Sequence, residues 1–428
     1  MPLYYLLLFA TPFHADPRLG ETLFDPGWGL LVTPVRALGL LTVAAALLAQ
    51  PPESNAPRLP NLIPVLFVPF AILPVLETVV FKLPVPSEEI GQLISGALLL
   101  IATRRFLRTR ARMLTATRTL VIAFALSSLW TYKQHFIEHV SRAWGVEGES
   151  NYEALMLLLM VPMAFWMWRQ ERSAWWRRIG LGCAILLVGG LFLTESRIGI
   201  VGLGVVGVLF VLHSKRKFVG LAFLAIAALL LLSYGPSSLL ERFRSIKVSG
   251  NVSNSDEGSA ELHMAMIKAG IYMIEAHPVF GVGVGLFKDV APLYNPEISK
   301  LIKGSYIGHN TFVQMGAECG LPELLLFMAM LACAFHSLRV GQHTSDEVIA
   351  WLCVAFWISL VGLCVVTLTQ SAQLLPFWIP IFFAQSLLEI AKAQPELSVS
   401  KGSSQARVSG SAAFGSVAPV LSASPSPS

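Results

Sequence analysis

Charged residues are scarce in this sequence: Asp, Glu, Lys and Arg together make up 13% of its 428 residues. Hydrophobic residues make up 54%, a share above that of soluble domains. The five cysteines are spaced in a way that predicts neither a disulfide pairing nor a metal-ligand motif. No basic stretch with interleaved aromatic residues indicates a nucleic-acid surface. These scarcities argue against a soluble domain, a cysteine-bound metal module and a nucleic-acid partner, and they indicate a polytopic membrane protein.

Long apolar runs are what the sequence has instead. A helix crosses the ~30 Å hydrocarbon core of a bilayer with about 20 residues. The candidate runs lie at residues 3–13, 28–48, 62–81, 90–103, 119–132, 154–168, 179–194, 198–213, 218–234, 310–338, 348–369 and 374–390. The first run lacks the charged segment that begins a signal peptide, so we expect it to be retained. We therefore predict an all-α integral membrane protein with about twelve transmembrane helices.

Basic residues gather in the short loops on one side of these spans. Arginines repeat between residues 104 and 118 and again between 169 and 178, and a third basic cluster lies at 213–217. Loops of this kind face the cytoplasm. With twelve spans both termini are then cytoplasmic, and the net charge of +5 reports topology rather than a polyanionic partner.

One external segment, residues 235–308, is much longer than the other loops and has the size of a lid or binding loop. Its helical pattern should end before Pro278, because the residue before a proline disfavours helical geometry. Gly281, Gly283 and Gly285 follow, and they predict either a tight turn or a backbone-amide cradle for a phosphate. The expected parts of the chain are a membrane bundle at 1–234, a helical periplasmic loop at 235–308, membrane spans at 309–392 and a disordered cytoplasmic tail at 393–428.

Ionisable residues at the ends of spans are the candidates for chemistry, since each costs a few kcal/mol inside a bilayer unless it is paired or hydrated. Glu195 and Arg197 form the tight external turn between the seventh and eighth spans. Arg197 is there either as an interfacial anchor or as a ligand for an anion. Arg242 and Arg244 begin the external loop. They form either a solvated basic patch or a grip on a diphosphate, for which guanidinium offers paired donors.

A polar stripe opens the tenth span. His309, Asn310, Gln314 and Glu318 recur at spacings near one helical turn, so His309 or Asn310 can share a face with the other two. A polar stripe that enters the bilayer indicates a wet cavity rather than a lipid contact. The imidazole of His309 has the pKa range to accept a proton near neutral pH. We therefore expect this stripe to form one wall of a reaction chamber.

Several of these residues belong to motifs that occur in order on the external side. The motifs are TESRIG at 194–199, ERFRS at 241–245, MIKAGIYMIEAHPVFGVGVGLF at 266–287 and HNTFVQMGAECGLPELLLF at 309–327. Together with Asn151 and Tyr152 at the start of the sixth span, they resemble the O-antigen ligase and O-antigen polymerase superfamily of bacterial membrane glycosyltransferases. The resemblance covers residues from about 145 to 330.

This resemblance implies a multi-pass enzyme of the bacterial inner membrane whose active site faces the periplasm. Such enzymes move a glycan from an undecaprenyl diphosphate carrier to an acceptor hydroxyl, for example on lipid A core. The resemblance implies that His309 is the general base and that Arg197 binds the carrier diphosphate. The other residues expected around the substrates are Glu195, Arg242, Arg244, His263, Asn310, Gln314 and Glu318. Because the leaving group is already a diphosphate, no cofactor and no obligatory metal is implied.

The sequence departs from the family pattern at His263, where many relatives have an arginine. Either the second cationic contact of the family is met by a charged His263, by Lys268, or by Arg242 or Arg244, or the donor or acceptor differs from the usual one.

The residues do not decide between related functions. A ligase that attaches the glycan to lipid A core or a similar acceptor is the leading hypothesis, and a polysaccharide polymerase and a protein O-oligosaccharyltransferase are its alternatives. A transporter of lipid-linked glycans is the alternative from another class. A transporter should show internal repeats and charged residues near the bilayer midplane, neither of which is evident in the sequence.

Overall fold

The computed structural model describes residues 1–14, 33–48, 62–84, 87–214, 217–218, 220–222, 225, 257–301, 310–370 and 375–410. Within these ranges the regular structure is helical. The helices long and apolar enough to cross a membrane are α4 (Leu62–Val80), α6 (Arg110–Phe136), α7 (Ser150–Gln170), α8 (Ala174–Leu193), α15 (Thr311–Gly341) and α16 (Glu347–Thr367). Shorter apolar helices are α1 (Pro2–Ala10) with the 3-10 turn η1 (Thr11–Phe13), α3 (Pro34–Leu48) and α9 (Arg197–His213). The described part of the chain is thus all-helical and has six helices that suit a multi-pass membrane protein, and the number of twelve spans stays a prediction.

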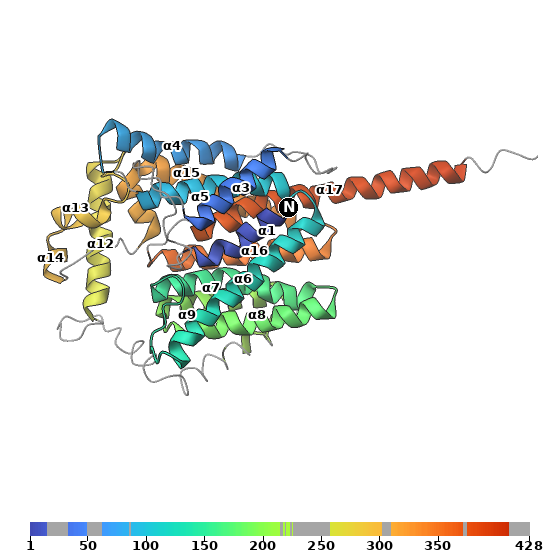
Figure 1. The fold of residues 1–428 in the computed structure, drawn as a ribbon, viewed down its shortest axis with the longest axis horizontal. Coiled ribbons are helices and arrows are strands. Elements are labelled where there is room, and N and C mark those ends of the chain that lie inside the picture. The colour runs from blue at the N-terminus through green and yellow to red at the C-terminus, as the bar shows by residue number, and fades with distance from the viewer. Residues whose placement is uncertain are drawn as a thin grey trace, which may run out of the picture.

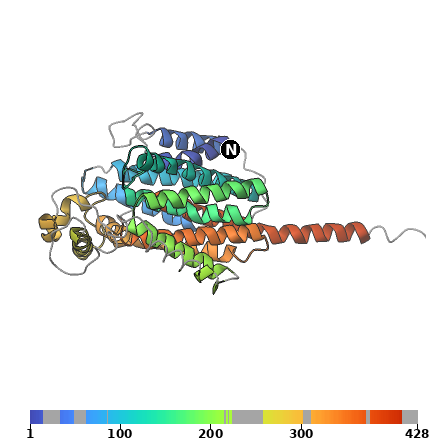
Figure 2. The same cartoon turned by 90° about the horizontal axis from the view of Figure 1, so that it is seen from below.

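The two ends of the helical bundle differ in what lies beyond them. At one end are α12 (Glu257–Ala276), α13 (Phe287–Tyr294) and α14 (Glu297–Leu301), and in Figure 1 α12 lies across the direction of the bundle helices. At the other end α17 (Leu375–Gly410) extends beyond the bundle, in both Figure 1 and Figure 2. We call the first the loop end. We call the second, where α6 begins with Arg110 and Arg112, the basic end.

Some helices run past the limits that the sequence predicts. The spans expected at 90–103 and 119–132 lie within the longer α5 (Ser87–Phe106) and α6, because polar and basic residues at a helix end lower the hydropathy without ending the helix. Likewise α17 continues to Gly410, into the segment 393–428 that is expected to be a disordered tail. Residues 411–428 lie outside the described ranges.

The centre of the bundle is formed by α7 and α16. In α7, 89% of the apolar stretch is buried inside the protein, against 28% in α8, which lies at the periphery. Side-chain caps set the starts of these two helices. Glu149 accepts a hydrogen bond from Tyr152 N at 2.7 Å to begin α7, and Asp346 accepts one from Val348 N at 3.0 Å to begin α16.

An aromatic cluster joins α4, α15 and α17. Trp378 stacks on Phe382 with ring centroids 5.4 Å apart, and both contact the edge of Phe67. Phe327 meets Trp378 from α15 at 6.2 Å. Offset and edge-to-face aromatic pairs stabilise by about 0.5–1.5 kcal/mol each beyond the area they bury. This cluster therefore fixes α4 beside α15, the helix on which the polar stripe lies.

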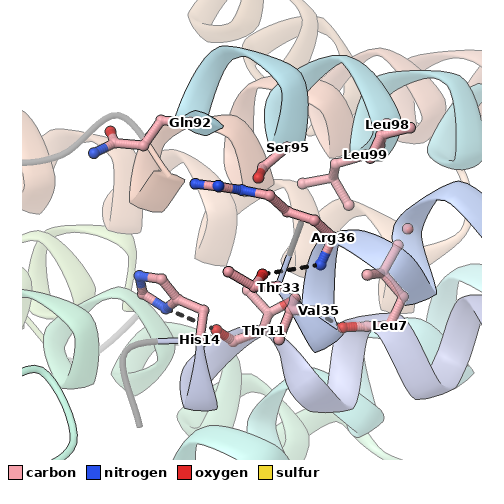
Figure 3. Close-up of a pocket in the computed structure, with 11 residues that line it drawn as sticks. Leu7, Thr11, His14, Thr33, Val35, Arg36, Gln92, Ser95, Leu98 and Leu99 are labelled. Carbon is pink, nitrogen blue, oxygen red and sulfur yellow. Dashed lines mark hydrogen bonds between the residues drawn. The ribbon is translucent and has the colours of Figure 1, made fainter. Parts of the chain in front are cut away.

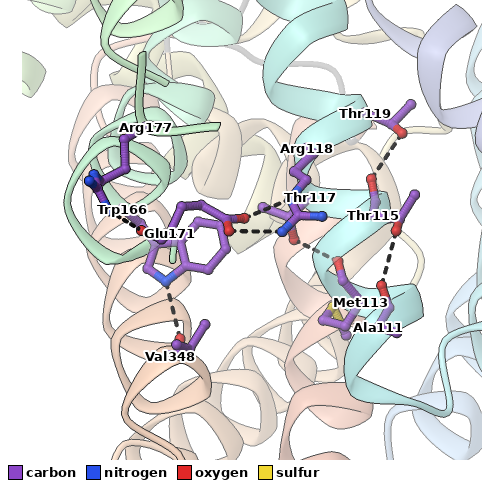
Figure 4. Close-up of polar contacts among 10 residues, drawn as sticks. All are labelled: Ala111, Met113, Thr115, Thr117, Arg118, Thr119, Trp166, Glu171, Arg177 and Val348. Atoms are coloured by element: carbon purple, nitrogen blue, oxygen red, sulfur yellow. Dashed lines mark hydrogen bonds and ion pairs between the residues drawn. The ribbon is translucent and has the colours of Figure 1, made fainter. Parts of the chain in front are cut away.

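At the basic end, arginines are paired with buried carboxylates (Figure 4). Arg118 Nε and Nη2 donate to the two oxygens of Glu171 at 2.6 and 2.8 Å, and the guanidinium lies 4.8 Å from the Trp176 ring. Arg110 forms a second pair with Asp346, the cap of α16. These bidentate and capping contacts tie α6 to the loop after α7 and to α16.

Candidate active site

The turn between α8 and α9 is held by buried hydrogen bonds. Ser196 caps α9 with its hydroxyl oxygen, and the same hydroxyl donates to Asn151 Oδ1 at 2.8 Å. Asn151 Oδ1 accepts a second hydrogen bond from Arg142 Nη2 at 3.0 Å. Glu195 closes the turn with a φ of 49°, which is uncommon for a residue other than glycine. Arg197, the first residue of α9, is therefore fixed in place at the loop end.

Arg197 and His263 come from separate elements and lie close enough to interact. His263 is half-buried on α12. Burial lowers the pKa of His263 below its usual 6.5, and the charge of Arg197 lowers it further. The imidazole is therefore largely neutral at neutral pH. The role of His263 as the second cation stays a prediction.

Asn310 begins α15 and fixes its position. Its Oδ1 accepts hydrogen bonds from two backbone N–H groups of the first turn, each at 3.0 Å, and its Nδ2 donates to Leu368 O at 2.9 Å. Both polar ends of the side chain thus bind protein atoms. Asn310 therefore positions the start of α15, and the substrate contact that the resemblance implies for it stays a prediction.

Gln314 and Glu318 share a face of α15, as their spacing predicts. Gln314 Nε2 donates to Glu318 Oε1 at 3.0 Å. The same oxygen accepts a hydrogen bond from Phe287 N, the first residue of α13, at 3.3 Å. Glu318 is 6% exposed, so its carboxyl links the start of α15 to the helices that cover the loop end.

A kink in α15 receives the glycine-rich segment that follows α12. The helix is interrupted at Gly320, whose φ is 79°. A Cβ at Gly320 would lie 2.3 Å from Val279 O, and one at Gly281 would lie 2.4 Å from Glu318 O. Gly283 N donates to that same Glu318 carbonyl at 2.9 Å. The glycines therefore form a tight turn packed on α15, which is one of the two structures that their pattern predicts.

Two further carboxyl groups lie near Glu318, and the sequence reasoning did not single them out. Glu77 on α4 is 5% exposed and Glu323 on α15 is 3% exposed. Each is close enough to Glu318 to interact with it electrostatically. A single carboxyl in an apolar run is the signal that could have found them, because such a residue is costly in a bilayer without a partner or a purpose.

A cavity of about 530 Å³ opens beside Glu77. Its walls are largely apolar and come from the end of α4, the turn after α12 and α13. At one side His277 Nε2 and the Tyr294 hydroxyl are 2.8 Å apart, at hydrogen-bonding distance. The volume falls within the ~300–1,000 Å³ of small-molecule sites. An amphipathic molecule therefore has room next to the carboxyl cluster.

The predicted site residues that the structure describes gather at the loop end. They are Glu195, Arg197, His263, Asn310, Gln314 and Glu318. His309, Arg242 and Arg244 lie outside the described residues. Among the side chains that the structure describes, no group of three or more His, Cys, Asp or Glu could hold a metal ion.

A family model described as O-antigen ligase matches residues 182–328. The matched range runs from α8 into α15 and contains Arg197, His263, Gln314 and Glu318. No curated protein matches the chain.

Proposed function

We propose that this chain, which a family model described as O-antigen ligase matches over residues 182–328, transfers a glycan from an undecaprenyl diphosphate carrier to an acceptor hydroxyl at the loop end. The observation that carries the proposal is the meeting of Arg197 and His263 at the end of the bundle where α15 begins. The guanidinium of Arg197 and the imidazole of His263 can each donate hydrogen bonds to an anion, so their approach supports a site that receives one.

In the proposed reaction His309 accepts the proton of the acceptor hydroxyl. The hydroxyl oxygen then bonds to the anomeric carbon of the glycan, and the bond from that carbon to the carrier diphosphate breaks. Arg197 holds the diphosphate and the negative charge that builds on it as it leaves. His309 directly precedes Asn310, the cap of α15, so this base would be presented at the loop end.

His263 is proposed to act as a second diphosphate ligand whose charge follows the substrate. It is largely neutral beside Arg197, and a bound diphosphate would raise its pKa again because opposite charge favours the imidazolium. Arg242 and Arg244 are proposed as further ligands of the anion. Glu195, Gln314 and Glu318 are proposed to support these groups.

The proposal also gives the lipid part of the donor a way into the site through an apolar cavity. The apolar cavity of about 530 Å³ lies between α4 and α13, beside the carboxyl cluster. A polyprenyl carrier would enter there from the side, with its diphosphate toward Arg197. We further propose that the loop end faces the periplasm and the basic end the cytoplasm, since basic residues mark cytoplasmic loops. The acceptor would be lipid A core or a similar glycolipid.

The experiment that tests this function is transfer by the purified full-length protein in detergent. It uses an undecaprenyl-diphosphate-linked glycan, a panel of lipid A core, glycan and protein acceptors, and parallel reactions with EDTA. We expect transfer that survives EDTA and is lost in His309→Ala and Arg197→Ala. The acceptor that works decides between a ligase, a polymerase and a protein glycosylating enzyme.

Two outcomes of this experiment would contradict the proposed function. A wild-type protein that transfers nothing to any acceptor, yet moves the lipid-linked glycan across the membrane of reconstituted vesicles, would replace the enzyme with a transporter. Transfer that stops with EDTA and returns with a divalent cation would overturn the metal-independent reaction.

A further inference from the structure

A cavity of about 270 Å³ lies at the basic end of the bundle. Its walls come from the first turns of α6, from the loop that joins α7 to α8, and from the starts of α8 and α16. The apolar part of the wall is formed by Leu114, Trp176 and Val348, and the polar part by arginines, one carboxyl and one hydroxyl. The cavity shares no lining residue with the one beside Glu77, so it is a separate place for a ligand.

Arginines outnumber carboxyl groups around this cavity. Arg118 donates to both oxygens of Glu171 (Figure 4), and Arg110 is paired with Asp346. The third arginine of the wall, Arg172, is exposed, and its guanidinium makes no hydrogen bond or ion pair within the part of the chain that the structure describes. The two ion pairs therefore leave one positive charge over, and Arg172 carries it.

The backbone on which Arg172 lies is held by hydrogen bonds. Arg177 Nη1 donates to Glu171 O at 3.2 Å and to Arg172 O at 3.1 Å. The ion pair from Arg118 fixes the same loop from the side of α6. Ser173 comes next in the chain, and its hydroxyl lines the cavity without capping α8. A guanidinium and a hydroxyl are thus presented to the cavity from a fixed loop.

Tryptophans indicate that the cavity lies at the level of a membrane interface. Four of the ten tryptophans of the chain fall between residues 166 and 176. Trp175 is 65% exposed, and the Trp176 ring that lines the cavity lies 4.8 Å from the guanidinium of Arg118. Tryptophans are enriched where a protein meets the headgroups of a bilayer, and basic residues gather on the cytoplasmic side. The cavity is therefore within reach of a lipid headgroup.

The cavity among α1, α3 and α5 differs in its charges (Figure 3). It has a volume of about 90 Å³, and its arginine, Arg36, interacts electrostatically with Glu88. The guanidinium of Arg36 lies against α5 and leaves no room for a Cβ at Gly91. Arg36 therefore joins α3 to α5 next to an acidic residue, whereas Arg172 has no such neighbour among the described residues.

The size and the walls of the basic-end cavity restrict its ligand. Its 270 Å³ is several times the volume of about 30 Å³ that one water takes in the liquid, so a phosphate with an attached glycerol fits. A guanidinium matches phosphate oxygens with paired N–H donors. Leu114 and Trp176 suit the apolar part of the same molecule. Basic cavities between membrane helices on the cytoplasmic side bind anionic headgroups in this way.

We propose that the basic-end cavity binds the phosphate group of an anionic phospholipid. Arg172 and the Ser173 hydroxyl donate to the phosphate oxygens, and the acyl chains lie outside the cavity along the bundle. The bound lipid contacts α6, α8 and α16 together and stabilises the basic end. This site involves neither the glycan donor nor the acceptor, so it stands independently of the proposed function.

Native mass spectrometry of the full-length protein in detergent tests the site. The probes are dioctanoyl phosphatidylglycerol, which is anionic, dioctanoyl phosphatidylcholine, which has no net charge, and inorganic phosphate. We expect phosphatidylglycerol to bind more tightly than phosphatidylcholine. Arg172→Gln should weaken phosphatidylglycerol binding roughly tenfold or more, as loss of a charged hydrogen-bonding partner does. Because Arg172 is exposed, this substitution should leave the fold intact.

Two further variants separate the cavity from the general charge of this end. Arg339→Gln is the matched control, because Arg339 is likewise exposed in the last turn of α15 and does not line the cavity. It should leave binding unchanged. Arg172→Lys keeps the charge and loses the paired donors, so it should keep only part of the affinity. Phosphatidylglycerol should also raise the unfolding temperature of the wild type more than that of Arg172→Gln, since a ligand of the folded state stabilises it.

Four results would overturn the proposal. Equal binding of phosphatidylglycerol to wild type and Arg172→Gln would remove Arg172 from the site. Equal weakening in Arg172→Gln and Arg339→Gln would mean that surface charge, and not the cavity, attracts the lipid. Phosphatidylcholine that binds as tightly as phosphatidylglycerol would contradict an anionic ligand. Inorganic phosphate that displaces the lipid at equal concentration would make a free phosphate the ligand.

Discussion

Charged side chains are arranged differently at the two ends of the bundle. At the basic end Arg118 and Arg110 are each matched to a carboxylate, and the Glu171 side chain that receives Arg118 is 4% exposed. At the loop end groups that would repel each other when charged are neighbours, with Arg197 near His263 and Glu77 near Glu318. Two opposite-charge pairs described there, Lys133 with Glu138 and Arg142 with Glu149, join side chains that are each 36–44% exposed.

This contrast separates charges that hold the fold from charges that serve a substrate. A buried ion pair keeps helices in register, and removal of one partner leaves an uncompensated charge. Like charges in proximity disfavour folding, and they persist where a ligand or a reaction needs them. We therefore propose that the loop end carries the function and that the basic end carries the architecture.

The largest effect is expected at the proposed base. His309→Ala should lower kcat by about 10²–10⁴-fold, as loss of a general base does. Donor binding should persist, because the proposal assigns the diphosphate to Arg197 and not to His309. Single-turnover transfer and equilibrium donor binding, measured on the same preparation, check this. Loss of binding together with kcat would instead make His309 a substrate ligand.

At the basic end the expected effect is on stability. Arg118→Ala leaves the buried Glu171 carboxylate without its bidentate partner and should lower the free energy of unfolding by about 3 kcal/mol. Unfolding in mixed micelles measures it. The double variant Arg118→Met with Glu171→Leu removes both charges and should regain most of the loss. A single variant as stable as wild type would show that this pair does not tie the helices together.

The kink in α15 provides a test with a smaller expected effect than that of the Arg118 variant. Gly320→Ala must hold a positive φ and meet Val279 O, so it should lower the free energy of unfolding by about 1–3 kcal/mol and reduce transfer. Gly204→Ala on α9 is the control, since no atom lies within 4 Å of its Cβ position, and it should be neutral or slightly stabilising. Equal effects of the two substitutions would contradict the docking of the glycine turn on the kink.

The smallest effect is the pH response of His263. A bound diphosphate should raise its lowered pKa, so donor affinity should increase from about pH 8 to about pH 6, tenfold for each unit or so of pKa rise. Without donor, the contribution of His263 to stability changes with pH in the opposite direction. The folded-state pKa lies below the unfolded value of 6.5, so this contribution to stability is full above 6.5 and is lost as pH falls below it.

His263→Gln is the variant that checks both slopes. It should flatten the change of donor affinity with pH and remove the loss of stability at low pH. Donor affinity that rises with pH in the wild type would contradict the assignment of His263 to the diphosphate.

The sequence alone predicted the all-helical membrane class and the gathering of polar residues at one end, because hydropathy and the spacing of Gln314 and Glu318 are local properties. The helix ends were less predictable. Polar residues at the ends of α5 and α6 lower the hydropathy of a window although the backbone continues as helix.

Contacts between distant segments could not be predicted from one sequence. The approach of His263 to Arg197 depends on where α12 packs, and the Gly91 contact with Arg36 depends on how α3 crosses α5. The same holds for the bond from Phe287 N to Glu318, which decides that the carboxyl caps α13. The pattern of each segment permits these contacts without specifying them. Glu77 was not singled out, although a lone carboxyl in an apolar run is a signal that the sequence contains.

The most direct test of the division between the two ends is a crossed comparison of Arg197→Ala and Arg118→Ala. Donor binding and the free energy of unfolding are measured for both variants and for wild type. We predict that Arg197→Ala loses donor binding and keeps its stability, and that Arg118→Ala loses stability and keeps donor binding under conditions where it is folded. Donor binding that is lost in Arg118→Ala and retained in Arg197→Ala would contradict the placement of the active site at the loop end.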